Sequence, residues 1–220
     1  RVVFHYGQSG NRPCTGSPEL LQPRLALKRI GIYGGTFDPI HHGHLILARE
    51  ALEQLMLEEI IFVPAAASPH KLDQRLTPPA IRTQMLEAAL SGMSCFSIDR
   101  CELNRPPPSY TFDTVEEIRQ RDPQTALYYL VGADNLPGLR SWHRIDALEK
   151  IVQFVVLERT GMLRESRFPT IQRHLDISAT EIRNRVACGR SIRYLVPDAV
   201  EHIIARERLY QDPQKLPKKL

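Results

Sequence analysis

The chain has 220 residues, of which 42% are hydrophobic and 25% charged, as is ordinary for a soluble globular protein with a buried core. Its formal net charge is only +4 and its basic residues are scattered among acidic ones, so no nucleic-acid partner is expected, although a mild excess suits an anionic substrate. No apolar run is long enough to cross a membrane, and the irregular spacing of Cys14, Cys95, Cys101 and Cys188 favours a reducing cytoplasm over a disulfide framework.

Both ends of the chain are expected to lie outside the folded part. Residues 1 to 27 mix glycine and proline with polar residues and lack helix or strand periodicity, so we expect a disordered extension. The chain begins with arginine rather than methionine, so we expect it to be a fragment, a processed form or the product of translation begun upstream of the natural start. Residues 1 to 27 are then expected to be additional to the folded protein. A flexible tail is expected over residues 211 to 220, which leaves a single domain over residues 28 to 210.

Between these ends, apolar runs alternate with amphipathic stretches. In chain order, we expect a strand over 29–34, a helix over 43–57, a strand over 59–64, a helix over 77–90 capped by Thr77, a strand over 96–100, a helix over 110–121, strands over 126–131 and 153–157, and a helical stretch over 178–208 broken at Gly189 and Pro197. Strands separated by helices imply right-handed crossovers. The pattern therefore predicts an α/β fold, a Rossmann-like doubly wound parallel sheet with helices on both faces, a C-terminal helical segment, and ligands beyond the carboxyl ends of the strands.

The strongest motif is Gly34-Gly35-Thr36-Phe37-Asp38-Pro39-Ile40-His41-His42-Gly43-His44, which connects the first strand to the first helix. Its two leading glycines let the backbone approach a ligand closely. The start of the helix offers free N–H groups and the positive end of its dipole to an anion, and phosphate is the obvious one. His41 and His44 lie one turn apart, so both imidazoles can face that ligand.

A metal site, a plain connecting turn or a phosphate loop of another kind fits this run less well. A His-x-x-His pair can ligate zinc, but Cys95, Cys101 and His70 show no paired spacing, so no resident metal site is expected. A Gly-Gly-Thr turn alone also fits an ordinary strand-to-helix connection. The run lacks the lysine of a P-loop and the third glycine of a dinucleotide fingerprint, which disfavours kinases and dehydrogenases.

A second motif, Ile177-Ser178-Ala179-Thr180-Glu181-Ile182-Arg183, opens the last helical stretch. Ser178 is expected to cap the helix, with Glu181 completing a capping box. Such caps also begin many helices that bind no ligand. Arg183 lies one turn into the helix, where a guanidinium can grip two phosphate oxygens.

Together the two motifs resemble the HxGH and ISxTxxR signatures of the nucleotidylyltransferase superfamily. Between them lie PAAASPHK at residues 64–71, Ser109-Tyr110-Thr111, Gly132-Ala133-Asp134-Asn135 and Trp142. With these segments the chain is similar to bacterial nicotinate-nucleotide adenylyltransferases from about residue 28 to 210. The resemblance implies a cytoplasmic enzyme that makes deamido-NAD from nicotinate mononucleotide and ATP.

The resemblance also implies roles for individual residues. It makes His41, His44 and Arg183 catalytic. It assigns ATP binding to Gly34, Gly35, Thr36, Phe37, His41, His44, Gly132, Asp134, Ile177, Ser178, Thr180 and Arg183. It assigns the mononucleotide to His70, Lys71, Tyr110, Thr111, Trp142 and His143, with the Trp142 indole stacked on the pyridine ring. Each of the less patterned residues has an alternative: Lys71 as a solvated loop lysine, Asp134 as a helix N-cap, and Trp142 as a core residue.

The implied reaction is in-line attack of the mononucleotide phosphate on the α-phosphorus of ATP, with loss of pyrophosphate and no covalent intermediate. The attacking phosphate is already ionised at neutral pH, so positioning and charge neutralisation are the main requirements. Mg²⁺ is expected to be held mainly by the ATP phosphates, which agrees with the lack of a carboxylate cluster in the sequence. The alternative functions are a nicotinamide mononucleotide adenylyltransferase, a pantetheine-phosphate adenylyltransferase and a nucleotide-sensing regulator. The sequence does not determine whether the chain forms a homo-oligomer.

Overall fold

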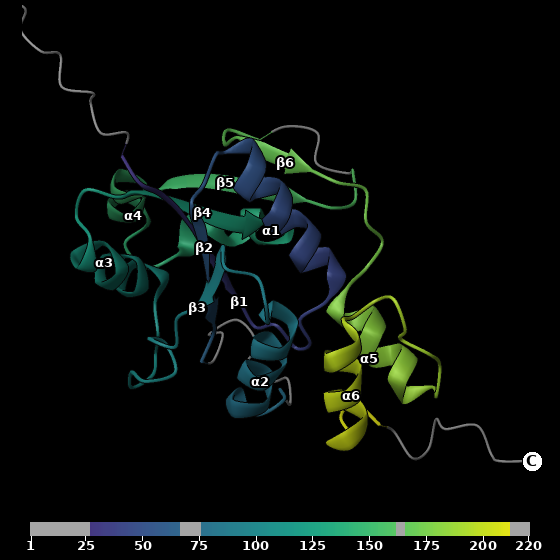
Figure 1. The fold of residues 1–220 in the computed structure, drawn as a ribbon. Helices are drawn as coiled ribbons and strands as arrows, with labels where there is room; N and C mark the ends of the chain where they lie inside the picture. The colour runs from purple at the N-terminus through teal and green to yellow at the C-terminus, as the bar shows by residue number, and fades with distance from the viewer. Residues whose placement is uncertain (1–26, 67–75, 162–165, 212–220) are drawn as a thin grey trace, which may run out of the picture.

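The computed structural model describes residues 27–66, 76–161 and 166–211, which form a parallel sheet with helices on both faces (Figure 1). The sheet contains β1 (Arg29–Gly35), β2 (Glu59–Pro64), β3 (Phe96–Ile98), β4 (Ala126–Gly132), β5 (Gln153–Glu158) and β6 (Thr170–Gln172). The strand order is β3-β2-β1-β4-β5-β6, and every neighbouring pair is parallel. From β1 at the centre, the chain therefore builds one half of the sheet through β2 to β3. It then returns to the other side of β1 and builds the second half from β4 to β6.

This order creates a switch point between β1 and β4, where ligands bind in open α/β sheets, beyond the carboxyl ends of the strands. Gly35 ends β1 and Gly132 ends β4, so both predicted glycine turns lie at this point. The expectation of a Rossmann-like doubly wound sheet is confirmed.

Two apolar cores lie on opposite faces of the sheet. Successive strand residues point to opposite faces, so Tyr33 packs into the first core and Ile32 into the second. The first core also contains residues of α1 (His42–Gln54), α2 (Pro79–Leu90), α5 (Ala179–Ala187) and α6 (Asp198–Arg206). The second contains residues of α3 (Thr111–Arg121), the 3₁₀ helix η1 (Ala133–Ser141) and α4 (Ile145–Ile151). The C-terminal helical segment is thus α5 and α6, as expected.

Several predicted elements begin or end at other residues in the structure, and three of these differences have a local cause. The first helix stops at Gln54 rather than residue 57, because Met56 has a left-handed φ of 52°. The third strand stops at Ile98, where the Asp99 carboxylate accepts from the Cys101 amide at 2.9 Å and turns the chain. The predicted Thr77 cap is wrong: α2 begins at Pro79 with Pro78 as its N-cap, and the Thr77 side chain bonds to the Tyr210 hydroxyl instead.

Three elements were not expected from the sequence. β6 has three residues, of which only Ile171 is buried, so it is too short to show an alternating pattern. η1 contains Pro137, and α4 has only seven residues. Their short lengths hide the helical repeat that predicted the longer helices.

The expected extension and tail cannot be compared with the structure, because residues 1–26 and 212–220 lie outside the described ranges. Within the described ranges, none of the helices combines the length and the apolar character needed to cross a membrane.

Candidate active site

The turn after β1 brings its backbone against other side chains. A Cβ atom on Gly34 would lie 2.5 Å from the Tyr129 hydroxyl, and one on Gly35 would lie 2.9 Å from the Phe37 ring. Both positions therefore need glycine. Phe37 has a φ of 48° and is 2% exposed, with its ring 5.2 Å from that of His44. Its side chain forms the floor of the turn, which leaves its backbone as the part available to a ligand.

The two predicted histidines lie together at the start of α1. Their rings stack with centroids 3.7 Å apart, and the His41 amide donates to His44 Nδ1 at 3.3 Å. A neutral imidazole carries one proton, so this bond places the proton of His44 on Nε2. Both ring nitrogens of His41 are buried without a partner in the described part of the chain. A buried ring nitrogen without a partner is free to bind a ligand.

Both imidazoles are neutral near pH 7. Burial holds the pKa of His41 well below its usual value, and the neighbouring His44 and Arg159 lower it further. Burial, followed by the charge of Arg159, lowers the pKa of His44 to about 3. In this state the histidines offer N–H donors rather than positive charge to a phosphate.

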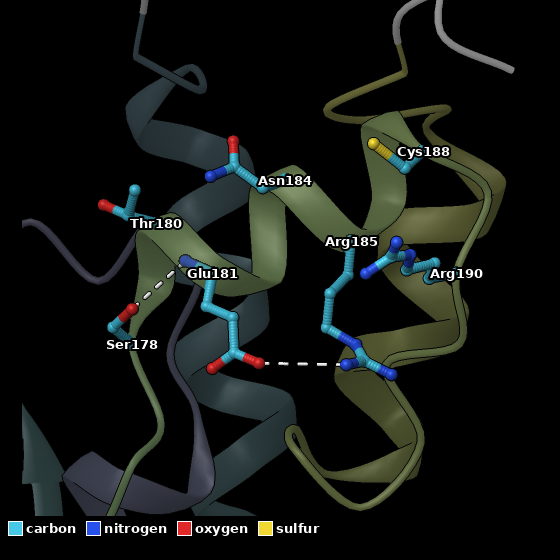
Figure 2. Close-up of a pocket in the computed structure, with 7 residues that line it drawn as sticks. All are labelled: Ser178, Thr180, Glu181, Asn184, Arg185, Cys188 and Arg190. Carbon is cyan, nitrogen blue, oxygen red and sulfur yellow. Dashed lines mark hydrogen bonds and ion pairs between the residues drawn. The ribbon is translucent and has the colours of Figure 1, made fainter.

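The second motif begins α5, as expected. Ser178 is the N-cap, and its hydroxyl accepts from the Glu181 amide at 3.1 Å (Figure 2). The Glu181 carboxylate lies 3.8 Å from Arg185, one turn along the helix. The structure therefore records only the Ser178 half of the predicted capping box, because the Glu181 side chain is directed to a cation instead.

Arg183 joins the two motifs. Its Nη1 donates to the Asp38 carbonyl at 2.7 Å, across 145 residues of sequence, and its Nη2 donates to the Thr180 hydroxyl at 3.2 Å. The motifs also approach each other at Gly43, where a Cβ atom would lie 3.4 Å from the Ile177 carbonyl oxygen. A guanidinium has five N–H donors, so Arg183 keeps donors for an anion.

Arg159 also belongs to this group, and sequence reasoning missed it. It follows β5, and its Nη1 donates to the Ile177 carbonyl at 3.1 Å. The buried carboxylate of Glu158 holds the adjacent turn by accepting from the amides of Thr160 and Gly161, at 2.5 and 3.2 Å. The sequence did contain a signal for Arg159: a cationic residue directly follows a buried strand, at the edge of the sheet where ligands bind.

The four described residues among those predicted to bind the mononucleotide gather around the start of α3. Tyr110 is the N-cap, and its ring stacks on His143 with centroids 4.3 Å apart. The Tyr110 carbonyl accepts from the amides of Asp113 and Thr114, whereas the Thr111 and Phe112 amides of the first turn have no acceptor within the helix. Free first-turn amides favour an anionic group here.

Trp142 lies between the core and the surface. Its indole is half-buried and makes edge contacts with Tyr129 and Phe154, at centroid distances of 5.8 and 6.3 Å. The Tyr129 hydroxyl, which lies close to Gly34, also bonds to the Thr111 side chain. Tyr129 thus connects the phosphate turn to the start of α3. His70 and Lys71 lie outside the described residues.

Asp134 is exposed in the first turn of η1, close to Gly132. The N-cap of η1 is Gly132, so the alternative interpretation of Asp134 as a cap is wrong. Its carboxylate accepts only a 3.3 Å bond from neighbouring Asn135 among the hydrogen bonds of the described residues. The carboxylate therefore remains accessible to ribose hydroxyls.

A surface hollow of about 440 Å³ runs along the flank of α5. Figure 2 shows Ser178 and Thr180 at one end and Cys188 and Arg190 at the other. Of the predicted site residues, only Ser178 and Thr180 line it, so the hollow borders the converging motifs without containing the histidines.

The described side chains offer little for direct metal binding. None of them forms a group of three or more His, Cys, Asp or Glu residues that could hold an ion. The Asp38 carboxylate accepts from the Thr77 amide and from the Tyr210 hydroxyl, one bond to each oxygen.

Comparison with known proteins agrees with this geometry. Residues 32–185 match the family model described as cytidylyltransferase-like. The chain is 43% identical over 185 residues to a probable nicotinate-nucleotide adenylyltransferase of Geobacillus thermodenitrificans, covering 83% of this chain and 86% of the relative. It is 38% identical over 188 residues to the nicotinate-nucleotide adenylyltransferase of Bacillus subtilis, covering 84% of this chain and 100% of the relative.

The fold is similar to solved structures with lower sequence identity. The Plasmodium falciparum nicotinic acid mononucleotide adenylyltransferase complexed with NaAD superposes with a TM-score of 0.70 at 21% identity, covering 83% of this chain and 97% of that one. The same protein complexed with APC gives a TM-score of 0.68 at 23% identity, with the same coverage of both chains.

Proposed function

The chain belongs to the nicotinate-nucleotide adenylyltransferase family of cytidylyltransferase-like proteins, and from this premise we propose how its residues perform the reaction. The reaction transfers the adenylyl group of ATP to nicotinate mononucleotide, giving deamido-NAD and pyrophosphate, a step of NAD biosynthesis. The single observation that carries the proposal is the bond from Arg183 to the Asp38 carbonyl, because it joins the two signatures.

The ATP phosphates bind where the two signatures meet. The amides of the Gly34-Gly35 turn and of the α1 start, the Nε2–H of His44 and the guanidinium of Arg183 are donors directed at one anionic ligand. His41 adds a second imidazole and Thr180 a hydroxyl. Arg159 adds a cation that we include in the site because it lowers the pKa of both histidines. Asp134 binds the ribose hydroxyls of the adenosine.

The mononucleotide binds across the start of α3. The Trp142 indole stacks on its pyridine ring, with Tyr110 and His143 beside it and His70 and Lys71 on its phosphate. The Thr111 and Phe112 amides, at the positive end of the α3 dipole, donate to the nicotinate carboxylate. The amide of nicotinamide would direct its own NH₂ toward these donors, and this mismatch favours the acid.

Catalysis is then mainly positioning and charge neutralisation. The mononucleotide phosphate attacks the α-phosphorus of ATP in line, and pyrophosphate leaves without a covalent enzyme intermediate. Mg²⁺ bound with the ATP phosphates would supply charge neutralisation for the transferring and leaving groups. The protein's neutral histidines and its arginines hold the phosphate oxygens. Free Cys95, Cys101 and Cys188 agree with a reducing cytoplasm as the site of the reaction.

A parallel assay tests this proposal. Pyrophosphate release is measured with ATP, Mg²⁺ and, separately, nicotinate mononucleotide, nicotinamide mononucleotide or phosphopantetheine. We expect nicotinate mononucleotide to give the highest kcat/KM. Equal rates with the two mononucleotides would establish dual specificity, a preference for phosphopantetheine would reassign the substrate, and nucleotide binding without turnover would indicate a sensor.

A further inference from the structure

A buried arginine lies directly beneath the two substrate loops. Arg82, on α2, is 1% exposed. Its Nε donates to the Thr77 carbonyl at 3.0 Å, its Nη1 to the Thr36 carbonyl at 2.7 Å and its Nη2 to the Ala65 carbonyl at 2.8 Å. One guanidinium thus uses each of its nitrogens on a different segment of backbone.

Burying an arginine side chain is costly compared with filling the same space with an apolar side chain. A buried charge must lose its hydration, and an apolar side chain of similar volume packs as well or better. Burial lowers the pKa of Arg82, and the charge of Asp38 opposes this effect. What an apolar side chain cannot do is donate to several carbonyls in a fixed planar geometry.

The three segments are those that hold the substrates. Thr36 lies in the ATP phosphate turn, and Ala65 follows β2 at the start of the loop assigned to the mononucleotide. The Ala65 amide also donates to the Gly35 carbonyl at 2.9 Å. Thr77 ends that loop and leads into α2. Arg82 therefore determines how far the ATP turn lies from both ends of the mononucleotide loop.

Asp38 connects the same segments to the rest of the site. Asp38 is 4% exposed, and its carboxylate accepts from the Thr77 amide at 3.0 Å and from the Tyr210 hydroxyl at 2.5 Å. Its carbonyl accepts from Arg183. Figure 1 shows α2 beside α6, the helix that precedes Tyr210. Any shift of this cluster would move the Arg183 anchor relative to the mononucleotide loop.

We propose that Arg82 is a positioning residue that, together with Asp38, holds the ATP turn at Thr36 in register with Ala65 and Thr77, the described residues on either side of the mononucleotide loop. This inference rests on the proposed function. In-line transfer requires the attacking phosphate and the α-phosphorus to be aligned, whereas each substrate binds to its own loop. Arg82 thus acts on the relative placement of the two substrates and contributes little to the binding of either one alone.

The test separates turnover from binding. In Arg82→Lys the charge remains, but one ammonium cannot hold three carbonyls in the guanidinium geometry. We expect kcat to fall about a hundredfold, the size of effect that a misplacement of roughly 1 Å produces. By calorimetry, the Kd of a non-hydrolysable ATP analogue and the Kd of nicotinate mononucleotide, each measured alone, should stay within about threefold of wild type.

The matched control is Arg206→Lys. Arg206 is an exposed arginine on α6 that donates to Gln84 of α2 at 3.1 Å, so it contacts the same helix without touching either loop. Its activity should equal that of wild type. Tyr210→Phe provides a second, milder variant, because it removes only the hydroxyl that bonds to the Asp38 and Thr77 side chains; we expect about a tenfold loss of kcat with both Kd values retained.

Several outcomes would overturn the inference. A folded Arg82→Lys with kcat within threefold of wild type removes the positioning role. Weakening of both Kd values by the same factor as kcat shows a merely structural role. If Arg82→Lys does not fold, Tyr210→Phe decides by the same comparison. Inactive wild-type protein would refute the proposed function as well, whereas active wild type with unaffected variants refutes this inference alone.

Discussion

Replacing Arg183 by lysine should damage catalysis although the charge is kept. The guanidinium is anchored by bonds of 2.7 Å to the Asp38 carbonyl and 3.2 Å to the Thr180 hydroxyl, and the proposal gives its remaining N–H groups to the ATP phosphates. The single ammonium of lysine cannot hold both anchors and a phosphate at once.

The magnitude follows from the bonds that are lost. A hydrogen bond to a charged group contributes about 1.5–3 kcal/mol. Losing one phosphate contact and the fixed orientation of the group should therefore raise the barrier by about 3 kcal/mol, which corresponds to roughly a hundredfold in rate. We expect kcat/KM for ATP to fall by this factor, while KM for nicotinate mononucleotide changes less than about threefold.

The assay is steady-state pyrophosphate release with each substrate varied in turn. The control is Arg185→Lys, two residues along α5, since Arg185 Nε donates to the Ser191 carbonyl at 2.7 Å and its guanidinium faces Glu181 (Figure 2). That variant should keep wild-type activity. If Arg183→Lys is as active as wild type, or if the Arg185 control loses as much, Arg183 is not the phosphate-gripping residue.

Three further predictions concern His44 and Trp142. His44→Ala should raise the barrier by about 3 kcal/mol, as removal of one oxyanion donor does, in a protein that is still folded at neutral pH; activity within tenfold of wild type contradicts the catalytic role. In the ligand-free protein the His44 pKa is about 3, below the 6.5 of the unfolded chain. The unfolded state then binds more protons between these values, so the free energy of unfolding falls as pH drops from 6.5 toward 3. Thermal melts across this range should show a smaller fall for His44→Gln than for wild type, and equal falls would refute the buried neutral state. Trp142→Ala should raise KM for both mononucleotides while leaving a preference of about a hundredfold for the acid, since stacking does not distinguish acid from amide; loss of that ratio would place the discrimination on the indole.

Much of the fold was predictable because it depends on local patterns. Buried parallel strands such as β4 read as apolar runs, and β2 was predicted with its observed bounds. The cap at Ser178 was predictable because a serine bonds an amide three residues away. Thr77 looked equally suitable as a cap. Its side chain instead bonds to the Tyr210 hydroxyl, which is far away in the chain.

The family signatures were also readable from the sequence, but the chemical state of their side chains was not. His41 and His44 appear in sequence as ordinary histidines with pKa values near 6.5. Only their burial and the nearby Arg159 lower those values. Similarly, Arg82 is one helical arginine among many charged residues until the fold encloses it under Thr36 and Ala65.

The sequence by itself determined the order of the longer strands and helices, the need for glycine at the end of β1 and the two helix starts that we propose bind phosphate, since these depend on residues within one or two turns of each other. Tertiary structure alone decided which of these segments meet. The return of the chain from β3 to β4, beside β1, creates the switch point, and the packing of α5 brings Arg183 to the Asp38 carbonyl. Desolvation, long-range hydrogen bonds and pKa values all depend on such distances through space, which no spacing along the chain specifies.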